Sequence, residues 1–231
     1  MRIEIGDAMK RLELMQQLSA LDREGVYVFS KGDFEKMFPD EQDKAFEKSL
    51  QRMVSDGILV RACKGIYVNP LARSKDGRVV EKVAQALRAG FFSYVSLESM
   101  LSEYGVISQI PIDRITIMTT GARGIYPTPF GTIEFTHTKR RPAEIIKRTL
   151  SMPGRPLRVA TKLAAVQDLA RAGRNTNMMI AEELGDLDLG EDDGQEGLQS
   201  ASRFGDDAAG ARVDAPSGGE GNPPLRHFPR P

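Results

Sequence analysis

The sequence has few of the residues that build disulfides and metal sites. Its 231 residues include one cysteine, Cys63, and two histidines, His137 and His227. A single cysteine excludes an internal disulfide, and so few sulfur and imidazole ligands are not enough for a structural zinc site. We therefore expect a protein without a bound metal or cofactor, suited to a reducing cytoplasm.

The sequence also lacks a long apolar run. Charged residues interrupt its most hydrophobic region, so no stretch of about 18 apolar residues occurs. These residues are Arg88, Glu98, Glu103 and Asp113. The first seven residues carry acids where a secretory signal would need basic residues followed by an apolar segment. These absences predict a soluble cytoplasmic protein with no membrane partner.

Net charge is absent as well, because 32 basic residues balance 32 acidic ones. The balance hides a division along the chain. Residues 185–231 carry ten acids and four arginines, net −6, which leaves residues 1–184 with 28 basic and 22 acidic residues, net +6. Binding to nucleic acid would therefore have to come from a local basic patch rather than from the total charge.

The composition of residues 185–231 is that of a disordered segment. Its 47 residues include nine glycines and five prolines but few large apolar side chains. Such a chain cannot bury enough apolar surface to offset an ordering cost of roughly 1 to 2 kcal/mol per residue. We predict a disordered acidic Gly/Pro-rich tail, either passive or competing with nucleic acid for the basic part of the chain.

The first 70 residues show the element order of a winged helix-turn-helix domain. Capping residues, periodicity and turns predict helices over residues 7–21, 30–38 and 40–56, a strand at 26–29 and a hairpin over 58–68. The first helix is predicted from a stripe of Leu12, Met15, Leu18 and Leu21 at three-residue spacing. In a winged helix the third helix enters the DNA major groove, and the hairpin touches the adjacent backbone.

The third predicted helix has one apolar and one polar face. Phe46, Leu50 and Met53 share one side, and basic and amide side chains lie opposite. Lys and Arg can donate to phosphates or guanine, and Gln can pair with adenine. With the two basic hairpin residues, the predicted DNA-binding set is Lys44, Lys48, Gln51, Arg52, Ser55, Arg61 and Lys64. The alternatives are a solvated face, because Asp43 and Glu47 also decorate this helix, and a protein-interaction module.

A second domain is predicted after a short polar linker over residues 71–78. Periodicity indicates helices beginning near residues 79, 96 and 159, and strands over residues 114–119 and 131–138. This gives a mixed domain over residues 79–184, with a small sheet and flanking helices. The whole chain is therefore predicted to have an α+β fold.

Four segments of the chain resemble one known family. They are residues 94–107 (YVSLESMLSEYGVI), 64–70 (KGIYVNP), 128–131 (TPFG) and 158–169 (RVATKLAAVQDL). Together they are similar, in order, to the AbiEi-type antitoxins, the abortive-infection antitoxins of type IV toxin-antitoxin systems. The resemblance spans roughly residues 8 to 182. It departs from the family at residues 162–164, where Lys-Leu-Ala replaces Pro-Glu-Lys, so no role of that Glu and Lys is carried over.

The resemblance implies a function. In such systems the antitoxin is a winged-helix protein that represses its own operon, and its C-terminal domain counters a nucleotidyltransferase-like toxin encoded beside it. The implied partners are double-stranded DNA of its own promoter and that toxin, with the oligomeric state left open. Two alternatives are a free-standing winged-helix transcriptional regulator without a toxin, and a winged-helix protein-interaction module.

We expect no catalytic residue. Cys63 has no histidine near it in sequence, and His137 lies on a predicted strand. Residues 120–124 resemble a phosphate-binding loop, but no Lys-Ser or Lys-Thr follows. Asp113 and Glu134 lack the acid-x-Lys pair of a metal nuclease. The protein is therefore predicted not to be an enzyme.

The predicted second domain also carries a basic cluster in its C-terminal half. It consists of Lys139, Arg140, Arg141, Lys147, Arg148, Arg155 and Arg158. The cluster would be an ordinary solvated surface, an auxiliary surface that contacts DNA phosphates, or a surface for an acidic partner or for a nucleic-acid substrate of the toxin. The sequence leaves these alternatives open.

Overall fold

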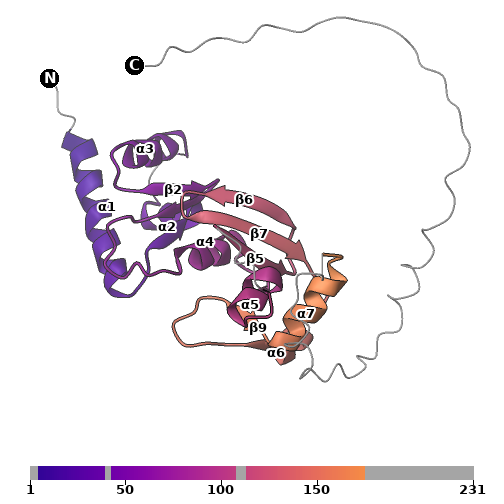
Figure 1. Cartoon of the computed structure of the whole chain (residues 1–231). Helices are drawn as coiled ribbons and strands as arrows, with labels where there is room; N and C mark the ends of the chain where they lie inside the picture. The colour runs from indigo at the N-terminus through magenta and orange to yellow at the C-terminus, as the bar shows by residue number, and fades with distance from the viewer. Residues whose placement is uncertain (1–4, 40–42, 108–112, 175–231) are drawn as a thin grey trace, which may run out of the picture. The chain divides into compact units, whose positions relative to one another are not determined.

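The computed structural model describes residues 5–39, 43–107 and 113–174. Within these ranges the chain forms seven helices and two sheets (Figure 1). The α+β class predicted from the sequence is confirmed at this level. The predicted tail over residues 185–231 lies outside the described residues.

The N-terminal part contains three helices and a small sheet. Its elements are α1 (Ile5–Arg23), β1 (Val28–Ser30), α2 (Lys31–Met37), α3 (Asp43–Ser55), β2 (Val60–Cys63) and β3 (Ile66–Val68). The strands form one antiparallel sheet in the order β1-β3-β2. Each element lies within about three residues of its predicted position.

The start of α2 shows how a local sequence signal predicts where a helix begins. Ser30 is the N-cap, and its hydroxyl accepts a hydrogen bond from the backbone N–H of Asp33 at 3.2 Å. The Asp33 carboxylate in turn accepts from the Ser30 backbone N–H at 2.8 Å. This is the capping box that the spacing of the two residues predicts, and it satisfies two backbone donors that would otherwise lack partners.

The predicted apolar stripe of α1 is partly wrong. The structure buries Leu14 and Leu18, whereas Leu12 and Met15 are 58% and 46% exposed. Residues three apart rotate by about 60° per step around a helix, so a strict three-residue spacing moves off the buried side. The i, i+4 pair of Leu14 and Leu18 stays on one face, and it is this pair that packs into the core.

The C-terminal part is built on a second, larger sheet. Its elements are α4 (Val79–Leu87), β4 (Ser93–Val95), α5 (Leu97–Glu103), β5 (Arg114–Thr119), β6 (Gly124–Thr128), β7 (Gly131–His137), α6 (Pro142–Arg148), β8 (Thr149–Leu150), β9 (Arg158–Ala160) and α7 (Lys162–Arg171). The strand order is β6-β7-β5-β4-β9-β8, and β5 pairs in parallel with β7. Helices α5 and α7 pack against each other (Figure 1).

This sheet is larger than the sequence predicted. Strands β5 and β7 match the two predicted runs, but β4, β6, β8 and β9 were not predicted. Three of these have only two or three residues, too few to show a period. Strand β6 contains Pro127, which suggested a loop; a proline is tolerated there because β6 lies at the edge of the sheet.

The last helix begins later than its apolar pattern suggested. Val159 belongs to β9, and α7 begins after the N-cap Thr161, whose hydroxyl accepts from the backbone N–H of Ala164 at 3.2 Å. Thr161 therefore supplies the cap where the family pattern has a following proline.

Two hydrophobic cores meet at β3, and one of them contains residues of both parts of the chain. In β3, Ile66 and Val68 pack into the core of the larger sheet, while Tyr67 between them packs with α1, α2 and α3. Successive side chains of a strand point to opposite faces, so the small sheet serves both cores. The segment predicted as a linker is anchored as well, since Tyr27 donates a hydrogen bond to Asp76 at 2.7 Å.

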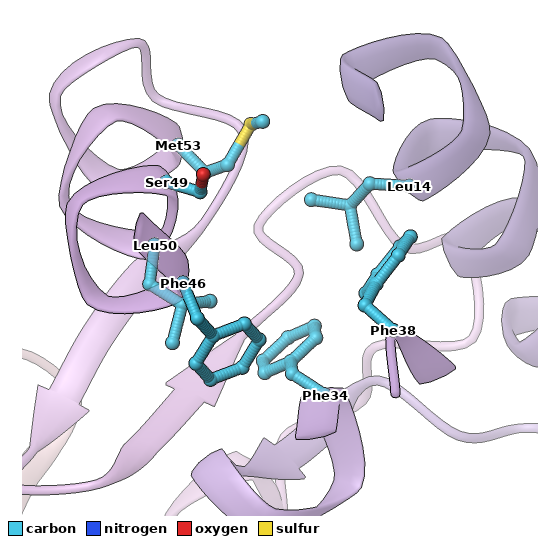
Figure 2. Close-up of a pocket in the computed structure, with 7 residues that line it drawn as sticks. All are labelled: Leu14, Phe34, Phe38, Phe46, Ser49, Leu50 and Met53. Atoms are coloured by element: carbon cyan, nitrogen blue, oxygen red, sulfur yellow. The ribbon is translucent and has the colours of Figure 1, made fainter. Parts of the chain in front are cut away.

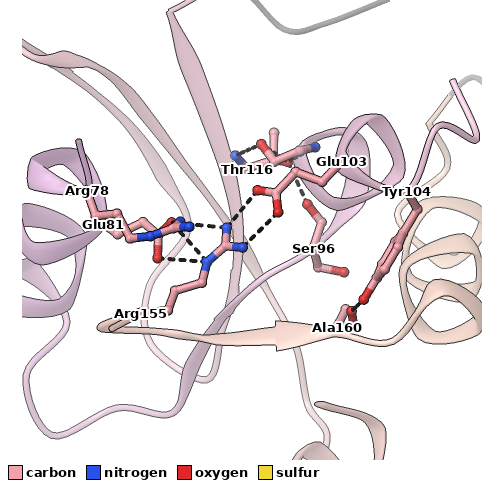
Figure 3. Close-up of polar contacts among 9 residues, drawn as sticks. Arg78, Glu81, Ser96, Glu103, Tyr104, Thr116, Arg155 and Ala160 are labelled. Carbon is pink, nitrogen blue, oxygen red and sulfur yellow. Dashed lines mark hydrogen bonds and ion pairs between the residues drawn. The ribbon is translucent and has the colours of Figure 1, made fainter. Parts of the chain in front are cut away.

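A buried arginine holds the loop between β8 and β9 (Figure 3). The Arg155 side chain is 3% exposed. Its Nε donates to both carboxylate oxygens of Glu81 at 3.0 and 3.1 Å, and its two Nη atoms donate to Glu103 at 2.7 Å each. Because Glu81 lies on α4 and Glu103 on α5, this guanidinium joins two helices to the loop. Arg78 adds a further bond to Glu81 at 2.8 Å.

We predict that Arg155→Met lowers the free energy of unfolding by about 3 kcal/mol, because it leaves the buried Glu81 carboxylate without its main partner. Urea denaturation of the full chain measures this change. The matched control is Arg123→Met, which removes an exposed arginine. The double variant Arg155→Met, Glu81→Leu should recover part of the loss, and a double variant less stable than Arg155→Met would contradict the pairing.

The contacts of Arg155 also predict a dependence on pH. The hydrogen bond from Arg155 holds the pKa of Glu103 below its ordinary value of 4.5. A carboxyl with a lowered folded-state pKa stabilises the fold fully above its ordinary pKa and loses this effect as the pH falls through the lower value. The stability difference between the native chain and Glu103→Gln should therefore shrink from about pH 6 to about pH 3. A stability difference that stays constant over this pH range would contradict a stabilising role of the ionised Glu103 carboxylate.

Candidate nucleic-acid interface

Helix α3 has the two faces that the sequence predicted. Phe46, Leu50 and Met53 are buried against the N-terminal core. The predicted DNA-contacting residues of the helix are all exposed: Lys44, Lys48, Gln51, Arg52 and Ser55. The helix ends as predicted at Gly57, whose φ of 72° is in the left-handed region that favours glycine. The predicted start at Asp40 lies outside the described residues.

Two acidic residues near this face, Glu47 and Asp56, form ion pairs with cations of neighbouring helices. Lys31 of α2 donates to the Glu47 carboxylate at 2.8 Å, and this bond lowers the pKa of Glu47. Arg11 of α1 forms an ion pair with Asp56 at 3.1 Å. Within the described ranges, Lys44 and Lys48 form no ion pair. Glu47 and Asp56 are therefore engaged by cations of α2 and α1 rather than by Lys44 or Lys48.

The hairpin after α3 presents two more basic residues. Arg61 on β2 and Lys64 in the turn are both exposed. The turn is closed by Gly65 at φ 77°, and its carbonyl accepts from the backbone N–H of Lys31 at 2.8 Å, which joins the hairpin to the start of α2. Cys63 is half-buried, and burial raises the pKa of its thiol. Lys31 thus contacts both the hairpin, through its backbone N–H, and α3, through its side-chain bond to Glu47.

An apolar cavity lies behind α3, and the sequence analysis did not foresee it. Figure 2 shows Phe46, Leu50 and Met53 of α3 facing Leu14 of α1 and Phe34 of α2. Ser49 and Phe38 complete the wall. The cavity holds about 30 Å³, room for about two water molecules and far less than a ligand pocket of several hundred Å³. It is a packing gap behind the candidate interface.

We predict that filling this gap stabilises the fold. Ser49→Met should raise the free energy of unfolding by about 1 kcal/mol, because a flexible apolar side chain replaces a hydroxyl on an apolar wall. Chemical denaturation provides the measurement. Ser55→Met, on the exposed face of the same helix, is the control. Equal effects of the two substitutions would mean that the longer side chain introduced by Ser49→Met does not fill the gap.

The basic cluster predicted for the C-terminal part does not form one surface. Arg140 and Arg155 are buried in ion pairs, and this corrects their predicted exposure. Arg148 and Arg158 are half-buried and donate to backbone carbonyls. The exposed members are Lys139, Arg141 and Lys147. The carboxylates that recruit the buried arginines come from α4, α5 and α7, and nearness along the chain could not reveal them.

The partner of Arg140 is a fully buried carboxylate, Asp168 of α7. Arg140 donates to it at 2.6 Å, Tyr94 at 2.9 Å and Ser96 at 2.8 Å. Arg148 approaches the same carboxylate at 3.5 Å. Burial, and then the charge of Asp168, raises the pKa of Tyr94 well above its usual value. The two family-like segments over residues 94–107 and 158–169 therefore meet in a structural network.

The described residues lack two kinds of feature. No group of three or more His, Cys, Asp or Glu side chains in them is arranged to hold a metal ion. None of their helices combines the length and the apolar character needed to cross a membrane.

Comparison with known proteins adds little. No protein-family model matches the chain, and no curated protein matches its sequence. Among solved structures, the crystal structure of the RV2827C protein from Mycobacterium tuberculosis is similar, with 18% identity and a TM-score of 0.44. The match covers 69% of this chain and 60% of that one, so the chain spans less than two thirds of that protein's length.

Proposed function

We propose that this chain binds double-stranded DNA through α3 and the β2–β3 hairpin, in the manner of a winged helix. The observation that carries the proposal is the exposed face of α3, where Lys44, Lys48 and Gln51 lie opposite the buried residues. A helix fits the major groove, and these side chains can bond to phosphates and base edges. Arg61 and Lys64 on the hairpin would contact the adjacent backbone.

The arrangement of the N-terminal elements supports this proposal. Helix α2 precedes α3 as the first helix of a helix-turn-helix does, and the hairpin follows α3 directly. The hydrogen bond from Lys31 to the turn at Gly65 joins α2 to the hairpin. The side chain of Lys31 also bonds to Glu47 of α3, and such contacts between the parts that would touch DNA would reduce the entropy lost on binding.

We further propose that the chain is an antitoxin that represses its own operon and counters a nucleotidyltransferase-like toxin. Support comes from the sequence resemblance over residues 8–182. Two segments that carry the resemblance converge on Asp168, through Tyr94 and Ser96. Tyr94, Ser96 and Asp168 therefore stabilise the fold itself, and this fold would carry the antitoxin function.

The first test removes two cations of α3 without touching the core. Lys44→Ala with Lys48→Ala should weaken binding to DNA upstream of the protein's own gene, and should reduce the salt-dependence slope by about 1.8 units, because each lost phosphate contact removes about 0.9. Fluorescence anisotropy over a range of salt concentrations measures both quantities.

The matched control is Lys75→Ala with Arg123→Ala, which removes the same charge from two exposed positions outside α3, the hairpin and the basic cluster of the C-terminal part. Its affinity and salt slope should stay near those of the native chain. Unchanged binding by the α3 variant, or an equal loss in the control, would refute DNA contact through α3.

A second test separates the two proposed activities. In cells that express the toxin encoded beside the gene, the full chain with Lys44→Ala and Lys48→Ala should still restore growth while a promoter reporter is no longer repressed. Substituting only exposed lysines of α3 leaves the C-terminal part intact. Loss of rescue at normal protein levels would contradict the assignment of neutralisation to the C-terminal part.

A further inference from the structure

A second, much larger cavity lies in the C-terminal part. It encloses about 410 Å³, within the range of small-molecule pockets. Its wall is formed by the end of β7 and the residues after it, together with α6 and α7. The polar lining includes His137, Thr138, Lys139, Arg140 and Arg171. This site shares no residue with α3 or with the β2–β3 hairpin.

The charges around this cavity leave an excess of cations. Two acids line it, and each has an arginine partner: Asp168 bonds to Arg140 at 2.6 Å, and Glu144 pairs with Arg141 at 3.4 Å. The two other cations of the wall, Lys139 and Arg171, are exposed. In the part of the chain that the structure describes, neither of them has an ion-pair partner.

Two further groups on the wall, Arg140 and His137, supply no hydrogen-bond donor to a ligand in the cavity. Arg140 is buried, and its Nη2 has no hydrogen-bond partner among the described residues. This atom has almost no accessible surface, so it does not face the cavity and offers no direct contact to a ligand there. The Nδ1 atom of His137 lies 2.8 Å from the carbonyl of Gly121 and must be the donor there, so Nε2 of the neutral ring is an acceptor and does not donate to a phosphate.

A cavity of similar size elsewhere makes a useful contrast. About 450 Å³ lies beside the end of α4, lined by Arg88 and Arg158 among others. Both of these arginines donate to backbone carbonyls, Arg88 to Ala122 at 2.8 Å and Arg158 to Thr149 at 2.7 Å. Its cations are thus engaged within the protein. The cavity beside β7 differs because Lys139 and Arg171 are unengaged.

We propose that the cavity beside β7 binds the phosphate group of a small phosphate monoester. Lys139 and Arg171 would supply both the charge that neutralises the phosphate and the N–H donors that bond to its oxygens. Phosphate oxygens are acceptors only, which suits a wall rich in N–H donors. The volume of about 410 Å³ leaves room for an organic group attached to the phosphate.

The test is calorimetric titration of the full chain with inorganic phosphate, with adenosine monophosphate and with uncharged adenosine. Both phosphates should bind and adenosine should not. Lys139→Ala with Arg171→Ala should weaken binding about tenfold or more, since it removes two charge-assisted contacts. Both positions are exposed, so the variant is expected to keep its fold, which circular dichroism checks.

The control is Arg123→Ala with Lys147→Ala, which removes the same charge from exposed positions that do not line the cavity. Tighter binding of adenosine monophosphate than of phosphate assigns the site to an ester, and equal binding assigns it to free phosphate; both support the site. No binding, or an equal loss in both variants, overturns it. The same titration with duplex DNA gives a further outcome. If Lys139→Ala with Arg171→Ala loses affinity only for duplex DNA, the proposal is overturned as well, because the two cations would then belong to a nucleic-acid surface.

Discussion

Asp168 is completely buried, and a carboxylate can remain charged there only if hydrogen bonds and an opposite charge replace the water it has lost. Arg140, Tyr94 and Ser96 supply these partners. They come from the segment after β7, from β4 and from the residue before α5, so one buried charge fixes several elements of the larger sheet relative to α7. Glu81 imposes the same requirement on Arg155.

This requirement divides the arginines and lysines of the C-terminal part into two groups. Those drawn to buried carboxylates, Arg140 and Arg155, stabilise the fold. Lys139, Lys147 and Arg171 remain exposed. A net positive charge along a stretch of sequence therefore says little about a binding surface until the buried acids have been located. In α3 no such division arises for Lys44 and Lys48, because no buried acid among the described residues pairs with them.

The sequence predicted the N-terminal elements well because their signals are local. The capping box of Ser30 and Asp33 and the apolar side of α3 are readable from a few neighbouring residues. The larger sheet was predicted poorly, since β4, β8 and β9 are too short to show a period, and pairing with distant strands creates them. The burial of Arg140 and Arg155 was missed for the same reason, as their partners lie 28 and 74 residues away.

The central claim is that α3 and the hairpin after it form a DNA-binding surface. Hydroxyl-radical footprinting of the full chain on DNA upstream of its own gene tests it most directly. The account predicts a protected site at which the backbone is covered on both sides of one major groove, with further protection where the hairpin lies. Uniform cleavage at every protein concentration, under low salt and with folded protein, would contradict it.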